Sequence, residues 1–157
     1  DIESAPYMEA IRQLKWELGK KAVCVHLTYV PYLKAAGEVK TKPTQHSVKE
    51  LQSVGIQPDI LVLRTEMHLG DSIRKKVAAF CNVDFDCVIQ SEDMPSIYEV
   101  PIEMQDQGLD TAILRKFGEP IGEKPRLRPW RSFLERRKKA KEIVNLGLGG
   151  KYGLQEG

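Results

Sequence analysis

The sequence has no apolar stretch long enough to cross a bilayer, and its first residues do not have the pattern of a signal peptide. It also carries little net charge, with 24 Lys and Arg against 22 Asp and Glu. A nearly neutral chain produces no broad electrostatic field that would attract nucleic acid or a membrane surface. These absences predict a cytoplasmic protein that binds neither membranes nor nucleic acid.

Cysteine is scarce and shows no metal-binding spacing. Cys24, Cys81 and Cys87 are odd in number, lie mostly among apolar residues and form no CxxC or Cys/His motif. Reduced structural thiols are the simplest interpretation. The sequence also lacks a Ser/His/Asp or Cys/His constellation, so it predicts no metal site and leaves the catalytic residues unknown in this chain.

The pattern of apolar residues predicts an α/β domain with a parallel sheet. Near-continuous apolar runs at 22–30, 59–64 and 87–90 are typical of buried strands. Amphipathic segments at about 45–54 and 71–80 separate these strands, and a further one begins at Ser4 and Pro6 and ends near Gly19. Strands that alternate with helices indicate parallel pairing.

The C-terminal part reads differently. Residues 96–117 are expected to be helical with breaks at Pro101 and Gly108, and a proline-containing loop follows. Residues 130–141 form a strongly basic helix, and 143–148 read as a strand before a glycine-rich turn. The basic helix would suit RNA or an acidic partner, but such charge is more often the solvated face of a helix.

The lysine-containing stretch at residues 38–46, EVKTKPTQH, is the strongest candidate for a binding loop. Lys40 and Lys42 are compact positive charges that suit phosphate oxygens. Gln45 offers both a donor and an acceptor to a base or a sugar. Thr44 precedes an apolar-periodic run, where its hydroxyl would cap a helix whose N-terminus favours anions. A solvated loop with two surface lysines fits the same residues about equally well.

Polar residues follow the C-terminal ends of all three predicted strands, at 38–45, 64–66 and 91–94. In parallel sheets, ligands bind beyond these ends. The three segments are therefore expected to converge on one edge of the sheet.

Residues 38–48, EVKTKPTQHSV, closely resemble the signature of the CTP synthases, the glutamine-dependent UTP amidoligases. Segments at 1–4 (DIES), 55–59 (GIQPD), 80–83 (FCNV) and 108–110 (GLD) match the same family in the same order. The resemblance implies a P-loop-like, Rossmann-type α/β synthetase domain. It assigns residues 1–118 to the C-terminal part of that domain, and 119–157 to a linker and the start of a glutaminase domain.

The resemblance also implies the chemistry. ATP phosphorylates O4 of UTP, ammonia released from glutamine attacks C4, and phosphate leaves to give CTP. Magnesium assists, GTP activates the full enzyme, and CTP is a feedback inhibitor. The family forms tetramers with the nucleotide site at a subunit interface.

The site residues that the resemblance implies fall into two groups. Those for UTP and CTP are Asp1, Ile2, Glu3, Arg12, Lys40, Thr41, Lys42, Pro43, Thr44, Gln45, Lys76 and Phe80. Those for ATP are Arg64, Glu92, Asp93 and Met94. Glu92 stands where some relatives have lysine, which predicts that it contacts ATP through its backbone.

Several family features are missing from the sequence. It contains neither the glycine-rich phosphate loop with its catalytic lysine, nor the magnesium ligands, which would lie upstream of Asp1, nor the glutaminase cysteine. The chain alone is therefore expected to make no CTP. A non-catalytic, pyrimidine-nucleotide-binding regulatory module is the alternative, and an RNA-binding module based on the basic helix ranks third.

Overall fold

The computed structural model describes residues 2–123, 127–142, 144–145 and 147. The chain divides into two compact units, Asp1–Arg126 and Leu127–Gly157. The helices of the first unit are α1 (Ala5–Leu18), α2 (Lys42–Ser53), α3 (Asp71–Cys81), α4 (Val100–Asp106) and α5 (Leu109–Phe117). Its strands are β1 (Val25–Val30), β2 (Tyr32–Leu33), β3 (Glu38–Val39), β4 (Ile60–Thr65) and β5 (Val88–Glu92). Three short 3-10 helices complete it: η1 (Gly19–Lys21), η2 (Phe85–Cys87) and η3 (Ile97–Glu99).

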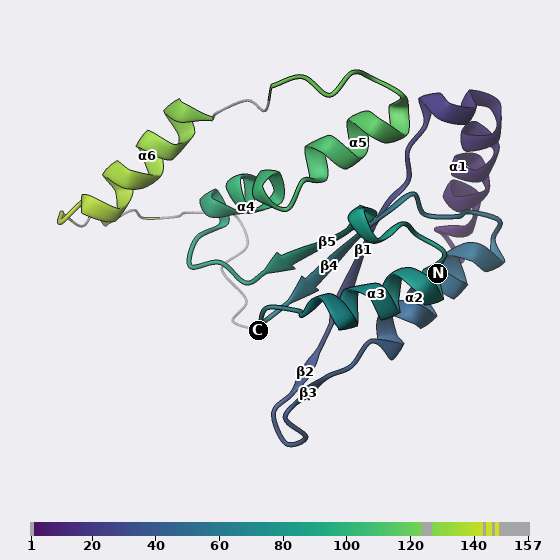
Figure 1. The fold of residues 1–157 in the computed structure, drawn as a ribbon, viewed down its shortest axis with the longest axis horizontal. Coiled ribbons are helices and arrows are strands. Elements are labelled where there is room, and N and C mark those ends of the chain that lie inside the picture. The colour runs from purple at the N-terminus through teal and green to yellow at the C-terminus, as the bar shows by residue number, and fades with distance from the viewer. Residues whose placement is uncertain (1, 124–126, 143, 146, 148–157) are drawn as a thin grey trace. The chain divides into compact units, whose positions relative to one another are not determined.

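The main sheet has the strand order β1-β4-β5, and both pairings are parallel. In the register, Val62 of β4 lies between Leu27 of β1 and Ile89 of β5. Helices α2 and α3 cover one face, and α4 and α5 lie on the other side, nearer β5 (Figure 1). The prediction of an α/β fold with a parallel sheet is therefore confirmed.

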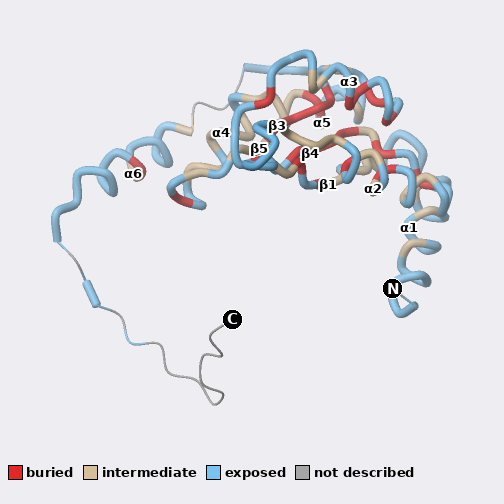
Figure 2. The backbone as a smooth tube through the Cα atoms, turned by 90° about the horizontal axis from the view of Figure 1, so that it is seen from below, coloured by how far each residue is buried: buried red, intermediate tan, exposed pale blue. Residues whose placement is uncertain are grey.

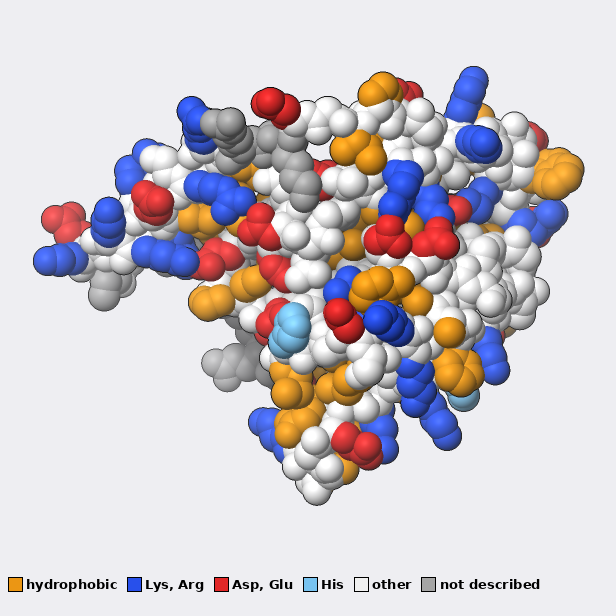
Figure 3. All heavy atoms as spheres, in the orientation of Figure 1, with side chains coloured by type: hydrophobic (Ala, Val, Ile, Leu, Met, Phe, Trp, Pro, Cys, Tyr) orange, Lys and Arg blue, Asp and Glu red, His pale blue; other side chains and the backbone are white. Residues whose placement is uncertain are grey.

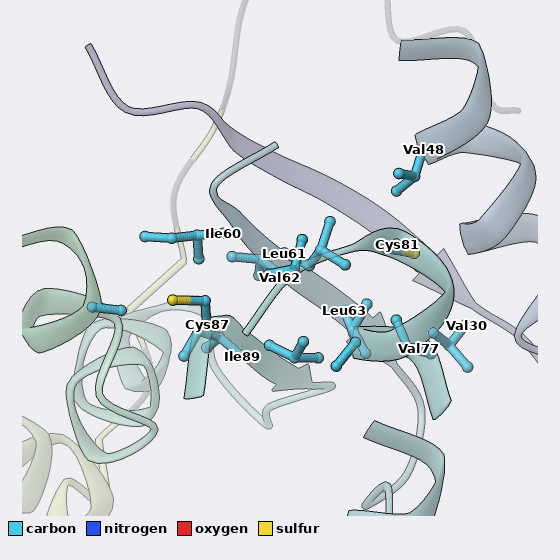
Figure 4. Packing of buried hydrophobic residues seen from close by; sticks show 14 of the residues in the cluster. Val30, Val48, Ile60, Leu61, Val62, Leu63, Val77, Cys81, Cys87 and Ile89 are labelled. Atoms are coloured by element: carbon cyan, nitrogen blue, oxygen red, sulfur yellow. The ribbon is translucent and has the colours of Figure 1, made fainter. Parts of the chain in front are cut away.

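The core is centred on β4. Ile60, Leu61 and Leu63 are fully buried, and side chains from the neighbouring strands and from α2 and α3 surround them (Figure 4). Buried segments follow the strands, whereas α1 is exposed along most of its length (Figure 2). Burial on both faces is what the continuous apolar sequence of a central parallel strand requires.

The prediction of a buried strand at residues 22–30 was wrong in part. β1 begins only at Val25, and its burial alternates along the strand. Leu27 is 64% exposed and Tyr29 is 46% exposed, whereas Thr28 and Val30 face α2 and are buried. The outer face of β1 is exposed because β1 is an edge strand of the described sheet, and the helices α4 and α5 cover β5 instead.

The prediction of a helix break at Pro101 needs correction, whereas the one at Gly108 is confirmed. Pro101 does not break a helix, because it lies in the first turn of α4, where a missing N–H costs nothing. Gly108 does separate α4 from α5, with a φ of 86° that suits glycine. The antiparallel hairpin of β2 and β3, with Gly37 at φ 65° in its turn, was not predicted.

The three cysteines are free thiols, as the sequence predicts for a reduced protein. Cys81 and Cys87 are buried and Cys24 is half-buried. Burial raises the pKa of Cys24 and of Cys81, which keeps both protonated and unreactive.

In the second unit, the structure describes one helix, α6 (Arg128–Lys139). It begins two residues before the predicted basic helix because Pro129 fits its first turn. The predicted strand at 143–148 and the glycine-rich turn after it lie largely outside the described residues. Among the described helices, none has the length and apolar character needed to cross a membrane.

Candidate functional site

The lysine-containing stretch runs from β3 of the hairpin into the first turns of α2, and the hairpin itself follows the C-terminal end of β1. Lys40 follows β3, and its N–H donates to the carbonyl of Pro31 at 2.9 Å. The Lys40 ammonium forms an ion pair with Glu38. This hydrogen bond and the charge of Lys40, with a smaller contribution from Lys76, lower the pKa of Glu38. The positive charges of the hairpin and α3 therefore act on the same small region.

The predicted role of Thr44 as a helix cap was wrong. α2 begins at Lys42 with Thr41 as its N-cap residue, so Thr44 lies inside the first turns. Thr44 is fully buried, and its hydroxyl lies 3.0 Å from Oγ1 of Thr28 and donates to the carbonyl of Tyr29 at 3.2 Å. Its side chain fastens α2 to β1, because a buried hydroxyl needs such partners.

A cavity of about 430 Å³ lies between the hairpin and α3, and we call it the hairpin cavity. Of the predicted nucleotide residues, Thr41 and Lys76 line it, and Glu38 beside Lys40 does too. Its remaining lining comes from the hairpin, the loop after β4 and α3: Tyr32, Gly37, Val39, Met67, His68 and Ile73. The cavity thus joins the end of β1 to the end of β4, as the sheet topology predicts.

The other residues of the lysine stretch lie beside this cavity. Lys42 and Pro43 are exposed in the first turn of α2. Gln45 is half-buried and donates from Nε2 to Oγ1 of Thr41 at 3.2 Å. Across the hairpin and α3, Figure 3 shows Lys and Arg side chains mixed with Asp and Glu, so the surface there is not uniformly basic.

The four residues predicted to bind ATP lie together in a second cavity of about 550 Å³, which we call the strand-end cavity. Its lining is Arg64, Ser91, Glu92, Asp93, Met94, Ile97 and Val100. The Asp93 N–H donates to the carbonyl of Thr65 at 3.0 Å, which holds the ends of β4 and β5 together. Arg64 Nε lies 3.8 Å from Asp93 Oδ1, a loose and largely exposed pair. A guanidinium in this position remains available to a ligand.

The N-terminal residues lie apart from both cavities. Asp1 lies outside the described residues, and Ile2 and Glu3 are exposed. Arg12 is paired with Glu9, its NH2 group 2.6 Å from Oε1, and lines a separate hollow of about 740 Å³ between α1 and the end of α2. A Cβ on Gly55 would come within 2.8 Å of Arg12 Cδ, so this side chain lies directly over the glycine backbone.

Phe80 does not belong to the core face of α3, although it stands at helical spacing from the apolar residues Ile73 and Val77. It is 57% exposed, whereas Val77, Ala78 and Cys81 are buried. The core face of α3 is therefore turned away from Phe80. This residue shares the outer surface of the helix with Lys76, although it does not line the hairpin cavity.

His68 and Gln90 contribute to the site but carry no clear signal in the sequence. His68 lies in the loop after β4, and its Nδ1 is 2.7 Å from Oε1 of Glu92. Gln90, on β5, is fully buried and contacts both of these side chains. Because the interaction spans 24 residues of sequence, only the parallel pairing of β4 with β5 brings these side chains together.

Magnesium has no candidate site in the part of the chain that the structure describes. No group of three or more His, Cys, Asp or Glu side chains is placed there to share a metal ion.

Comparison with known proteins identifies the family. The family model described as CTP synthase N-terminus matches residues 1–118. The chain belongs to this family.

Curated relatives agree with this assignment. The chain is 70% identical over 158 aligned residues to the CTP synthase of Bacteroides thetaiotaomicron, an alignment that covers 99% of this chain and 29% of that protein. It is 66% identical to the CTP synthase of Bacteroides fragilis and 62% identical to that of Porphyromonas gingivalis, each over 97% of this chain and 28% of the relative. The chain thus spans less than a third of the length of these CTP synthases.

Proposed function

We propose that this chain is the pyrimidine-nucleotide-binding part of a CTP synthase, a ligase that uses ATP to aminate UTP to CTP with ammonia from glutamine. The observation that supports this most is the hairpin cavity. It lies inside the segment matched by the family model and brings Thr41 and Lys76 together, beside the Lys40–Glu38 pair.

Positive charge is the main contribution of these residues. Lys40, Lys42 and Lys76 would neutralise the triphosphate of UTP, or of CTP as feedback inhibitor, because compact ammonium groups suit phosphate oxygens. Thr41, Pro43 and Gln45 would shape the start of α2 around the nucleotide. Thr44, being buried, would act only by holding α2 against β1. Phe80 would lie near the base of the inhibitor.

The strand-end cavity is proposed to hold the adenine nucleotide. Arg64, Glu92, Asp93 and Met94 combine an exposed guanidinium, carboxylates, backbone groups and an apolar side chain at one place. Phosphoryl transfer requires two nucleotides held in a fixed relative position with their charges neutralised. Two cavities at neighbouring strand ends, each with one nucleotide, would supply the first of these requirements.

The distance of Ile2, Glu3 and Arg12 from the lysines is explained by assembly. In a homotetramer with the nucleotide site at a subunit interface, these residues and Asp1 would complete the pocket of a neighbouring subunit. The proposal also includes a cytoplasmic location, for which the free cysteines are the support. Magnesium and the activator GTP belong to the full enzyme, and the proposal assigns neither to residues of this chain.

Calorimetric titration of the chain with UTP, CTP and uridine tests this function. Both triphosphates are expected to bind, and uridine at least about 10-fold more weakly, because it lacks the charged groups that the lysines recognise. The affinity for UTP should also fall as salt is added. Equal affinities for uridine and UTP, or no binding of either triphosphate, would contradict the proposal.

A further inference from the structure

A side chain that lines the hairpin cavity is in hydrogen-bonding contact with a side chain that lines the strand-end cavity. His68 lines the hairpin cavity and Glu92 lines the strand-end cavity. Nδ1 of His68 lies 2.7 Å from Oε1 of Glu92. Since a carboxylate oxygen only accepts hydrogen bonds, this contact requires a proton on Nδ1, which donates to Oε1 of Glu92. Nε2 of Gln90 lies 2.6 Å from the same Nδ1 and, being a donor as well, gives its hydrogen bond to Oε1 of Glu92 instead. The wall between the two cavities therefore contains an imidazole–carboxylate pair.

Buried Gln90 fixes the position of this pair. Its Oε1 accepts from the N–H of Leu69 at 3.0 Å, and its Nε2 donates to Oε1 of Glu92 at 2.8 Å. Both ends of a fully buried amide are thus used, which leaves Gln90 no alternative orientation. The Leu69 contact also holds the loop that carries His68, so the amide positions both partners.

The outer atoms of the pair remain available to ligands. Within the described part of the chain, neither Nε2 of His68 nor Oε2 of Glu92 has a hydrogen bond. The His68 side chain is 71% exposed and that of Glu92 is 30% exposed. A histidine whose inner nitrogen is held by a carboxylate presents its outer nitrogen in a defined direction.

A second carboxylate increases the dependence of Glu92 on His68. Burial raises the pKa of Glu103 on α4, and repulsion from Glu92 contributes to the same shift, whereas His68 opposes it. Without the imidazole, the charge of Glu92 would face Glu103 with only the amide of Gln90 to hold it.

We propose that His68 is a positioning residue shared by the two nucleotide cavities. On one side it holds Glu92, and with it the end of β5 that is proposed to contact the adenine nucleotide. On the other side its imidazolium form, with Nδ1 donating to Glu92, presents Nε2–H to the phosphates of the pyrimidine nucleotide. This inference rests on the proposed function, because it assigns one nucleotide to each cavity.

The test is whether a substitution in one cavity lowers the affinity for the nucleotide assigned to the other cavity. His68→Ala is expected to weaken binding of a non-hydrolysable ATP analogue about 3- to 10-fold, although His68 does not line the strand-end cavity. Glu92→Ala should weaken UTP binding by a similar factor. For each nucleotide, the double variant should be little worse than the more damaging single variant, since both changes break the same contact.

Two further variants separate positioning from general damage. His68→Asn places an amide nitrogen where Nδ1 stands, so it should restore the affinity for the ATP analogue. Lys76 lines the hairpin cavity but does not contact Glu92. Lys76→Ala should therefore weaken UTP binding and leave the affinity for the ATP analogue unchanged. Thermal melting of each variant checks that the fold is retained.

Unchanged affinity for the ATP analogue in His68→Ala would overturn the inference, as would a loss that His68→Asn does not restore. These results differ from failure of the proposed function, in which the wild-type chain would bind neither nucleotide and the inference would fall with it. The inference would be supported if His68→Ala weakens binding of the ATP analogue, Glu92→Ala weakens UTP binding, and His68→Asn restores the affinity for the ATP analogue.

Discussion

Replacing Lys40 and Lys42 together by alanine is expected to weaken UTP binding about 30-fold or more. Hydrogen bonds to charged groups contribute about 1.5 to 3 kcal/mol each, and solvent screening of these lysines lowers the sum for the pair to about 2 kcal/mol, which corresponds to about 30-fold in affinity. Lys40 is half-buried beside the hairpin cavity, and Lys42 stands in the first turn of α2, where the helix dipole adds to its attraction for phosphate. Isothermal titration of wild type and variant measures the difference.

Lys49→Ala provides the matched control for this prediction. Lys49 is an exposed lysine on the same helix, two turns further along, and lines none of the described cavities. Lys49→Ala removes one charge from α2 and leaves the hairpin unchanged, so the affinity for UTP should change less than about twofold. Equal losses in Lys49→Ala and in the double variant would mean that general charge, rather than the hairpin cavity, accounts for binding.

Leu63→Ala is expected to lower the free energy of unfolding by about 2 to 5 kcal/mol. Leu63 is fully buried in the central strand (Figure 4). It is paired in register with Thr28 on one side and Gln90 on the other. Truncation removes apolar contacts and leaves a cavity that the surrounding strands and helices cannot easily close. Urea denaturation followed by circular dichroism measures the change.

The control for the core prediction lies on the neighbouring strand. Leu27→Ala makes the same chemical change on β1, but the Leu27 side chain is 64% exposed. This substitution is expected to lower the free energy of unfolding by less than about 1 kcal/mol. A large loss in Leu27→Ala with a small one in Leu63→Ala would contradict the described sheet, because the two leucines would have to exchange environments.

The strands and helices with strong periodicity could be predicted from the sequence. β4 lies within one residue of the predicted strand, since a central parallel strand is apolar on both faces. α3 begins at the predicted Asp71, because an acidic residue and a following serine are typical of a first turn. The burial of β1 could not be predicted, because the same apolar run suits an edge strand and a central one.

Part of the candidate site could be predicted and part depended on the fold. Thr41, Lys76 and four of the residues that line the strand-end cavity came from the resemblance to the CTP synthases, and the structure gathers them into two cavities. The hairpin was missed because strands of two residues leave no periodic pattern. Thr44 was misassigned because a threonine before an apolar run resembles a cap, whereas here its hydroxyl is satisfied by β1. The His68–Glu92 contact depends on strand pairing, which local sequence does not reveal.

The most direct test of the central claim is a crystal structure of this chain grown with CTP. The account predicts the triphosphate in the hairpin cavity, with phosphate oxygens within hydrogen-bonding distance of Nζ of Lys40 and Nζ of Lys76. Arg12 of a neighbouring copy near the same nucleotide would further support the shared pocket. CTP bound in the strand-end cavity, or against α1 and away from the lysines, would contradict the account.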